Sequence, residues 1–301
     1  MAVSSGTKTI VTALLANVTV AVAKLFGFIV TASSSMLAEA LHSIADSSNQ
    51  VLLLIGKKKA AALPSAERQF GAGRERFFWG FVVSLIVFSL GSVYAIYEGV
   101  HKILAPEPVD SLWWALAILG FAMCTEGFAF KTALKEGKEL KGKHSWSNFI
   151  KRAKGPELPV VLLEDFGALT GLSFAFICVL LADLTGNPIF DGIGTLGIGL
   201  LLGGIAFVLA KETRSLLIGE GALPEQADAI ESAILDAEGV VALIEMRSEF
   251  VGPENLLVAA KVEFSADLEY NELVLAIQSV ENAVRVAEPL VKMIYIEPDK
   301  A

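Results

Sequence analysis

Residues 37–50 read LAEALHSIADSSNQ, and this stretch places ionisable side chains inside a long apolar segment of the chain. His42 and Asp46 are four residues apart, so a helix carries them on one face with about 5–6 Å between their Cβ atoms. Glu39 and Asn49 continue the same stripe. An imidazole and a carboxylate at this spacing are typical ligands of zinc, which prefers nitrogen and oxygen donors in tetrahedral geometry.

The composition around this stretch is that of a membrane protein. Of 301 residues, 54% are hydrophobic and 19% are charged, and the mean hydropathy is +0.60. Soluble domains rarely combine so much apolar content with so little charge. A membrane-spanning helix needs about 20 mainly apolar residues. Six windows qualify: 9–30, 36–55, 77–100, 112–132, 159–181 and 190–210. The sequence therefore predicts an all-α bundle of six transmembrane helices.

A second acidic pair lies inside the fifth window. Glu164 and Asp165 interrupt an otherwise apolar run, and ionisable groups at this depth are costly unless they face a wet cavity or an ion path. One imidazole and two or three carboxylates from two helices can form a tetrahedral metal site. The alternative is that these groups only pair with one another and hold the bundle together. The two cysteines are not in a CxxC arrangement, which disfavours a thiolate metal site.

The sequence pattern changes after the last window, from long apolar segments to shorter helices and strands. This change predicts two domains, residues 1–215 and residues 216–301. A helix is expected at 224–236, strands at 240–250 and 256–264, a helix at 271–287 and a strand at 291–296. This α-β-β-α-β order predicts a small α+β domain with helices on one sheet. From Glu220 onward the chain has 17 acidic and 5 basic residues, which argues against nucleic acid as a partner.

The distribution of lysine and arginine indicates the orientation of the chain in the membrane. They concentrate in the loop between the second and third windows and in the loop between the fourth and fifth, whereas Lys102 is the basic residue on the opposite side. Positively charged short loops stay on the cytoplasmic side. We therefore expect a multi-pass integral membrane protein with both termini in the cytoplasm, either in a bacterial inner membrane or in an organelle with the termini facing the matrix.

The order of these residues resembles that of the cation diffusion facilitator family. The resemblance covers nearly the whole chain and is carried by Ser33-Ser34-Ser35, Glu39-Ala40-Leu41-His42-Ser43, Asp46, Phe70-Gly71, Asp191 and Ser215-Leu216-Leu217-Ile218-Gly219-Glu220. Thr125-Glu126-Gly127 and the Glu164-Asp165 pair are most similar to the zinc-transporter-nine-like branch, which includes mitochondrial proteins.

The resemblance implies six spans, a cytoplasmic ferredoxin-like domain and a homodimer. It also implies a metal site with two ligands from the second span and two from the fifth, each pair four residues apart. His42 and Asp46 match the first pair, and Asp165 matches the later position of the second pair. The earlier position is Val161, which cannot bind a metal, so Glu164, Asn49 or a water would complete the site. The last domain has no histidine, so we expect one transport site per protomer and no regulatory metal site there.

These observations predict a transporter rather than an enzyme. A divalent cation, most simply zinc, would exchange for protons by alternating access, because metal binding requires neutral His42 and ionised Asp46 and Asp165. The expected partners are the metal ion, protons, membrane lipid and a second copy of the chain, with no cofactor besides the transported metal. Manganese, iron or cobalt as cargo, and a scaffold that has lost transport, remain as alternatives. An intramembrane metallo-enzyme is disfavoured, since no His-Glu-x-x-His motif occurs.

Overall fold

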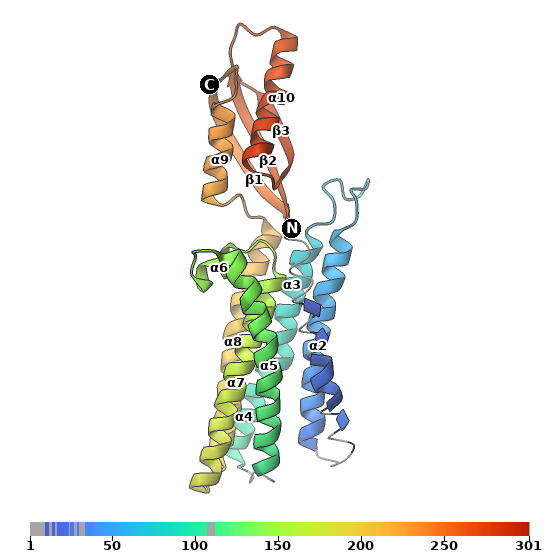
Figure 1. The fold of residues 1–301 in the computed structure, drawn as a ribbon, viewed down its shortest axis with the longest axis vertical. Helices are drawn as coiled ribbons and strands as arrows, with labels where there is room; N and C mark the ends of the chain where they lie inside the picture. Colours follow the sequence, from blue (N-terminus) through green and yellow to red (C-terminus); the bar gives the residue numbers. More distant parts are fainter. Residues whose placement is uncertain are drawn as a thin grey trace. The chain divides into compact units, whose positions relative to one another are not determined.

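A computed structural model describes residues 34–106 and 112–300, together with helical positions scattered between residues 10 and 29. Part of the predicted first span, including Lys24, therefore lies outside the described residues. In the second predicted span the backbone is described, but the side chains of Glu39 and His42 also lie outside them. The described elements are α2 (Ser34–Ala60), α3 (Glu75–Ile86), η1 (Val87–Val93), α4 (Tyr94–Leu104), α5 (Leu112–Lys141), α6 (Trp146–Arg152), α7 (Glu157–Thr185), α8 (Ile189–Ile218), α9 (Pro224–Leu235), β1 (Val240–Gly252), β2 (Asn255–Phe264), α10 (Tyr270–Ala287) and β3 (Val291–Pro298) (Figure 1).

The chain forms two compact units. The first comprises Met1–Lys58 and Phe78–Thr213, and the second comprises Lys59–Phe77 and Arg214–Ala301. The division near residue 214 lies close to the predicted domain boundary at 215, within α8. The loop that follows α2 packs with the C-terminal residues, although the sequence pattern placed it in the membrane domain.

Four helices in the described ranges are long and apolar enough to cross a membrane. They are Glu75–Leu104, which joins α3, η1 and α4 without a break, Leu116–Lys141 in α5, Glu157–Thr185 and Ile189–Ile218. These helices contain most of the third to sixth predicted windows. The second window is helical within α2, while its crossing of the membrane, and hence the count of six, stays a prediction.

Helix α7 contributes most to the core of the first unit. Its residues Leu158, Val160, Val161 and Leu162 are buried with side chains of the neighbouring helices. The neighbours in this cluster are Leu53 of α2, Val83 of α3, Val87 of η1, Ala133 of α5, and Ile205, Ala206 and Leu209 of α8. The helix that carries Glu164 and Asp165 is therefore held on several sides by apolar packing.

Glycines let α8 approach the third predicted span closely. A Cβ atom added to Gly199 would lie 2.7 Å from the backbone nitrogen of Ile96. The Ser92 hydroxyl, in the π-helical turn η1, donates a hydrogen bond to the Gly199 carbonyl at 2.8 Å. Small residues at such crossings allow helix backbones to meet within a membrane. The glycines of α8 therefore contribute to the packing of these helices.

Gly199→Ala is expected to lower the thermal stability of the protein, because the new methyl group would lie 2.7 Å from the backbone nitrogen and 2.8 Å from the side chain of Ile96. Overpacking of this kind costs about 1–3 kcal/mol. Gly204→Ala is the matched control on the same helix, since nothing lies within 4 Å of a Cβ atom there. Thermal unfolding in detergent should show a lower midpoint for the first variant alone. Equal midpoints would contradict the tight crossing.

The second unit contains a three-stranded sheet in the order β1-β2-β3 (Figure 1). Strand β1 is antiparallel to β2, and β2 is parallel to β3. Alternate residues of β2 are buried on the face that the helices cover. The cluster on this face includes Leu256, Val258, Ala260 and Val262 of β2, Ile230 and Ile234 of α9, and Val280 and Val284 of α10. The predicted α-β-β-α-β order is confirmed.

The segment Lys59–Phe77, which includes the loop after α2 and the first residues of α3, belongs to this second unit through specific contacts. Phe77 is fully buried in the same cluster as Leu216 and Phe250. The Arg74 guanidinium lies 2.6 Å from the Glu249 carboxylate, and that of Arg76 lies 3.3 Å from Glu254. The arginines of this segment therefore do more than set topology, although ion pairs exposed to this degree add only about 0–1 kcal/mol each.

Candidate metal site

Asn49 and Gln50, at the end of the polar stripe of α2, face the interior of the first unit. Asn49 is 2% exposed and Gln50 is completely buried, while Asp46, one turn earlier, is half-buried. A helix brings residues three and four apart onto one face, so Asp46 shares its face with both amides. The side chain of His42 lies one further turn away by sequence and is not among those described.

Glu164 of α7 is bound by the amides of α2. Asn49 Nδ2 donates to Glu164 Oε1 at 3.0 Å, and Gln50 Nε2 donates to Glu164 Oε2 at 3.5 Å. Gln50 in turn accepts a bond from Asn17 Nδ2 at 3.4 Å. Both oxygens of Glu164 are thus engaged, and the predicted candidates Glu164 and Asn49 contact each other.

Asp165, the next residue, is different. It is 2% exposed, and its Oδ2 atom has no hydrogen-bond partner in the part of the chain that the structure describes. The Oδ1 atom of Asn49 is buried without a partner in the same way. Buried polar atoms are nearly always hydrogen-bonded, so two unpaired oxygens in one polar region require an explanation. Oxygen atoms that are directed at a cation would be such an explanation.

Glu126 of α5 is a further carboxylate in this region, and the sequence analysis did not select it as a site residue. It lies near enough to both Asp165 and Glu164 for electrostatic interaction, as does Asp46. The signal was present in the sequence, because Glu126 is an acidic residue inside the apolar fourth window, like Glu164 and Asp165 in the fifth. Asp46 of α2, Glu126 of α5, and Glu164 and Asp165 of α7 therefore form one acidic region between these three helices.

No three His, Cys, Asp or Glu side chains among those described converge closely enough to hold a metal ion. The predicted set of His42, Asp46 and Asp165 is not covered by this statement, since the His42 side chain is outside the described residues. Val161 is completely buried in the apolar core, so this position of α7 contributes packing.

The transmembrane region of the chain matches a family model over most of its length. The model describes the cation efflux transmembrane domain, and the match covers residues 10–218. The chain belongs to the cation efflux family. The resemblance to cation diffusion facilitators that the sequence motifs indicated is thereby confirmed.

Individual members of the cation efflux family align with most of this chain. The proton-coupled zinc antiporter SLC30A9, mitochondrial, of Xenopus laevis is 32% identical over 244 residues, which is 80% of this chain and 44% of that protein. Its Homo sapiens counterpart is 31% identical over 251 residues, or 82% of this chain and 43% of that protein. The chain thus spans less than half the length of these relatives. A solved structure of the MamM C-terminal domain aligns with 25% of this chain and 90% of its own, at 16% identity and a TM-score of 0.24.

A second polar contact of the cation efflux domain lies away from the acidic region. Lys102 of α4 forms an ion pair with Asp191 of α8, with 2.9 Å between Nζ and Oδ2. Asp191 lies in the first turn of α8, and the ion pair ties that turn to the end of α4.

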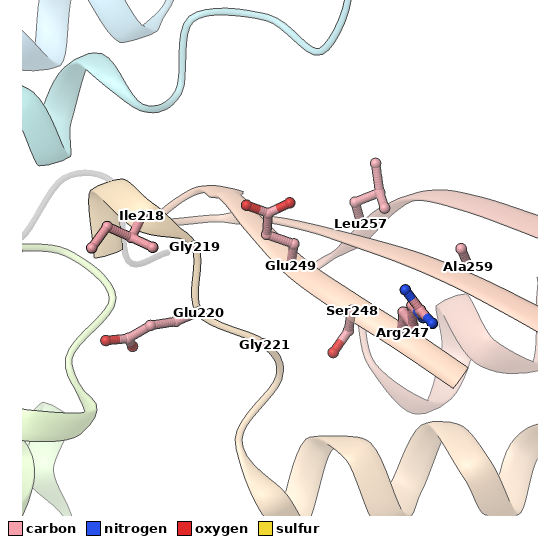
Figure 2. A pocket seen from close by; sticks show the side chains of 9 residues that line it. All are labelled: Ile218, Gly219, Glu220, Gly221, Arg247, Ser248, Glu249, Leu257 and Ala259. Carbon is pink, nitrogen blue, oxygen red and sulfur yellow. The ribbon is translucent and has the colours of Figure 1, made fainter. Parts of the chain in front are cut away.

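A pocket of about 450 Å³ lies in the second unit, between the segment after α8 and strands β1 and β2 (Figure 2). Its charged residues have partners elsewhere. Glu249 pairs with Arg74 at 2.6 Å, and Arg247 pairs with Glu245 at 2.6 Å. The pocket offers no set of convergent metal ligands, so the acidic region between α2, α5 and α7 is the candidate metal site.

Proposed function

We propose that this protein transports a divalent metal ion, with zinc as its cargo, in exchange for protons. The observation that carries the proposal is the buried, unpaired carboxylate oxygen of Asp165, in an acidic region of a cation efflux domain. The relatives named as proton-coupled zinc antiporters supply the choice of zinc and of protons. In this proposal His42, Asp46 and Asp165 bind the metal.

Alternating access follows from the chemistry of these ligands. A metal ion binds only when His42 is neutral and the two aspartates are ionised, so its binding releases protons. Protons that enter from the opposite side would reload the same groups and expel the metal. Glu164 has a supporting role, since both of its oxygens accept bonds from the amides of Asn49 and Gln50. It therefore holds α2 against α7 next to the site.

The remaining architecture is proposed on the same grounds. The protein has six spans, both termini lie on the side of the two basic loops, and the C-terminal domain is ferredoxin-like and joins two protomers in a homodimer. The basic loops would face the cytoplasm, or the matrix in an organelle. The names of the relatives favour a mitochondrial membrane as one of these cases.

Zinc uptake into proteoliposomes with an imposed pH gradient tests this function. The parent protein is expected to accumulate zinc only when the gradient is present, and Asp46→Ala is expected to abolish the uptake. Manganese, iron and cobalt added as competitors would establish the cargo. If well-folded dimers carried none of these metals, the proposal would be contradicted and a scaffold function would be favoured.

A further inference from the structure

We propose that Glu126 forms a second cation-binding site, called here the second station. It is separate from the transport site and displaced from it along the bundle. The cation would be the divalent metal ion that Asp46 and Asp165 bind, so this inference deepens the proposed function and rests on it. The second station lies toward the distal end of the bundle, which is the end where α4 finishes at Leu104 and α7 finishes at Thr185.

The exposure of α5 side chains places Glu126 on the interior face of its helix. Ala122, Ala129 and Ala133 are 3%, 4% and 0% exposed, while Phe121 and Phe128 are 48% and 65% exposed. Residues 122, 126, 129 and 133 follow the three- and four-residue spacing of one helix face. Glu126 therefore shares the buried stripe of α5.

The packing of α5 against α7 gives the displacement. The rings of Phe130 and Phe166 contact each other at a tilt of 46°, with 6.3 Å between their centroids, and a Cβ atom on Gly127 would lie 4.0 Å from Leu169. Residue numbers fall along α5 as they rise along α7, so the two helices run in opposite directions. Asp165 is then level with residue 131 of α5. Glu126 lies five residues closer to the distal end, which is about 7–8 Å at 1.5 Å per residue.

This displacement explains why the carboxylates interact without forming one cluster. Glu126 and Asp46 both act electrostatically on Asp165. Yet no three of the described acidic side chains converge at coordination distance. Two stations displaced by about 7–8 Å along the bundle fit both observations. The unpaired Oδ2 atom of buried Asp165 would be shared by a cation that passes between them.

A second station would help the ion leave the first. An ion held by several ligands in a low-dielectric bundle dissociates slowly unless a new negative charge is in reach, because charges there interact strongly. Conduction through membranes commonly requires sites that bind well enough to receive an ion and are close enough to pass it on. Glu126 would therefore increase the rate of transport and leave the affinity of the first site nearly unchanged.

The test separates zinc binding from zinc flux for Glu126→Gln, which keeps the size of the side chain and removes its charge. Equilibrium zinc binding to the purified protein is expected to stay within about threefold of the parent, while maximal flux into proteoliposomes falls at least about tenfold. Glu126→Asp, which keeps the charge, should retain more flux than Glu126→Gln and provides a second variant. Glu139→Gln is the control, since Glu139 is exposed on α5 and lies nearer the opposite end.

Each outcome has a distinct meaning. Parent-like flux in Glu126→Gln overturns the second station. A loss of zinc affinity as large as that of Asp165→Asn also overturns it, because Glu126 would then be a ligand of the first site. If the parent protein itself carries no zinc, the proposed function fails, and the second station fails with it. Flux through the parent together with unchanged flux through Glu126→Gln rejects the second station alone.

Discussion

Asp165→Asn is expected to reduce zinc flux at least about 100-fold while the protein keeps or gains thermal stability. Loss of an outer-shell partner already costs a metal site roughly 10- to 100-fold, and Asp165 is proposed as a direct ligand. The same side chain is 2% exposed and leaves Oδ2 without a hydrogen bond in the described part of the chain. A buried polar atom of this kind costs about 1–3 kcal/mol of stability. A neutral amide of equal size removes the charge from this environment.

The measurement compares thermal unfolding with and without zinc. A ligand at about 100 times its dissociation constant stabilises the folded protein by about 2.7 kcal/mol, so zinc should raise the unfolding midpoint of the parent. It should leave the midpoint of Asp165→Asn unchanged. Asp183→Asn is the matched control, because Asp183 is exposed near the end of the same helix. A zinc-dependent shift in Asp165→Asn equal to that of the parent would remove Asp165 from the site.

The contrast between Asp165 and Glu164 shows a limit of what can be predicted from the sequence. Both are acidic residues at one depth in the same apolar window, and helical geometry directs them about 100° apart. Which of them carries an unpaired oxygen depends on the partner across the interface, which is Asn49 and Gln50 for Glu164. Glu126 could have been selected from its position in an apolar window alone. The position of Glu126 along the bundle relative to Asp165 could not be predicted, because it depends on how α5 packs against α7.

The C-terminal unit was more predictable than the membrane helices. Strand β2 was expected at 256–264 and is observed at Asn255–Phe264, since alternation of buried residues is a strong local signal. The π-helical turn Val87–Val93 has no comparable signal in its sequence. Helix α6 was missed although Ser145 caps it by accepting a hydrogen bond from the Asn148 backbone at 3.2 Å. A Ser at a helix start is a recognisable cap, so this error was avoidable.

The packing of the first turn of α3 against the C-terminal unit could not be predicted from the sequence, for another reason. Phe77 is an apolar residue at the predicted start of a transmembrane helix, where an apolar residue is ordinary. Its burial against residues more than 130 positions later, such as Leu216 and Phe250, is a long-range contact that no local pattern encodes. The same holds for the pairing of Arg74 with Glu249.

Phe77→Ala is expected to destabilise the second unit by about 3–5 kcal/mol, the usual cost of truncating a fully buried phenylalanine. Phe77 is 0% exposed and belongs to the cluster that includes Phe250 and Leu256. The cavity left by the ring would lie inside a small domain whose total stability is of similar size. Amide hydrogen exchange in β2, whose buried residues share the cluster, should therefore become at least roughly 100-fold faster, because 1.4 kcal/mol is a factor of ten.

Phe78→Ala is the control for Phe77→Ala, since the adjacent ring is 47% exposed and lies outside this cluster. It should leave the exchange of β2 within a few-fold of the parent. Zinc should still raise the thermal midpoint of the first unit in both variants, because neither ring belongs to the acidic region of α2, α5 and α7. Unchanged exchange in Phe77→Ala would mean that the first turn of α3 rests on the domain without contributing to its core. Faster exchange in β2 with retained zinc binding would show that this turn stabilises the C-terminal unit independently of the metal site.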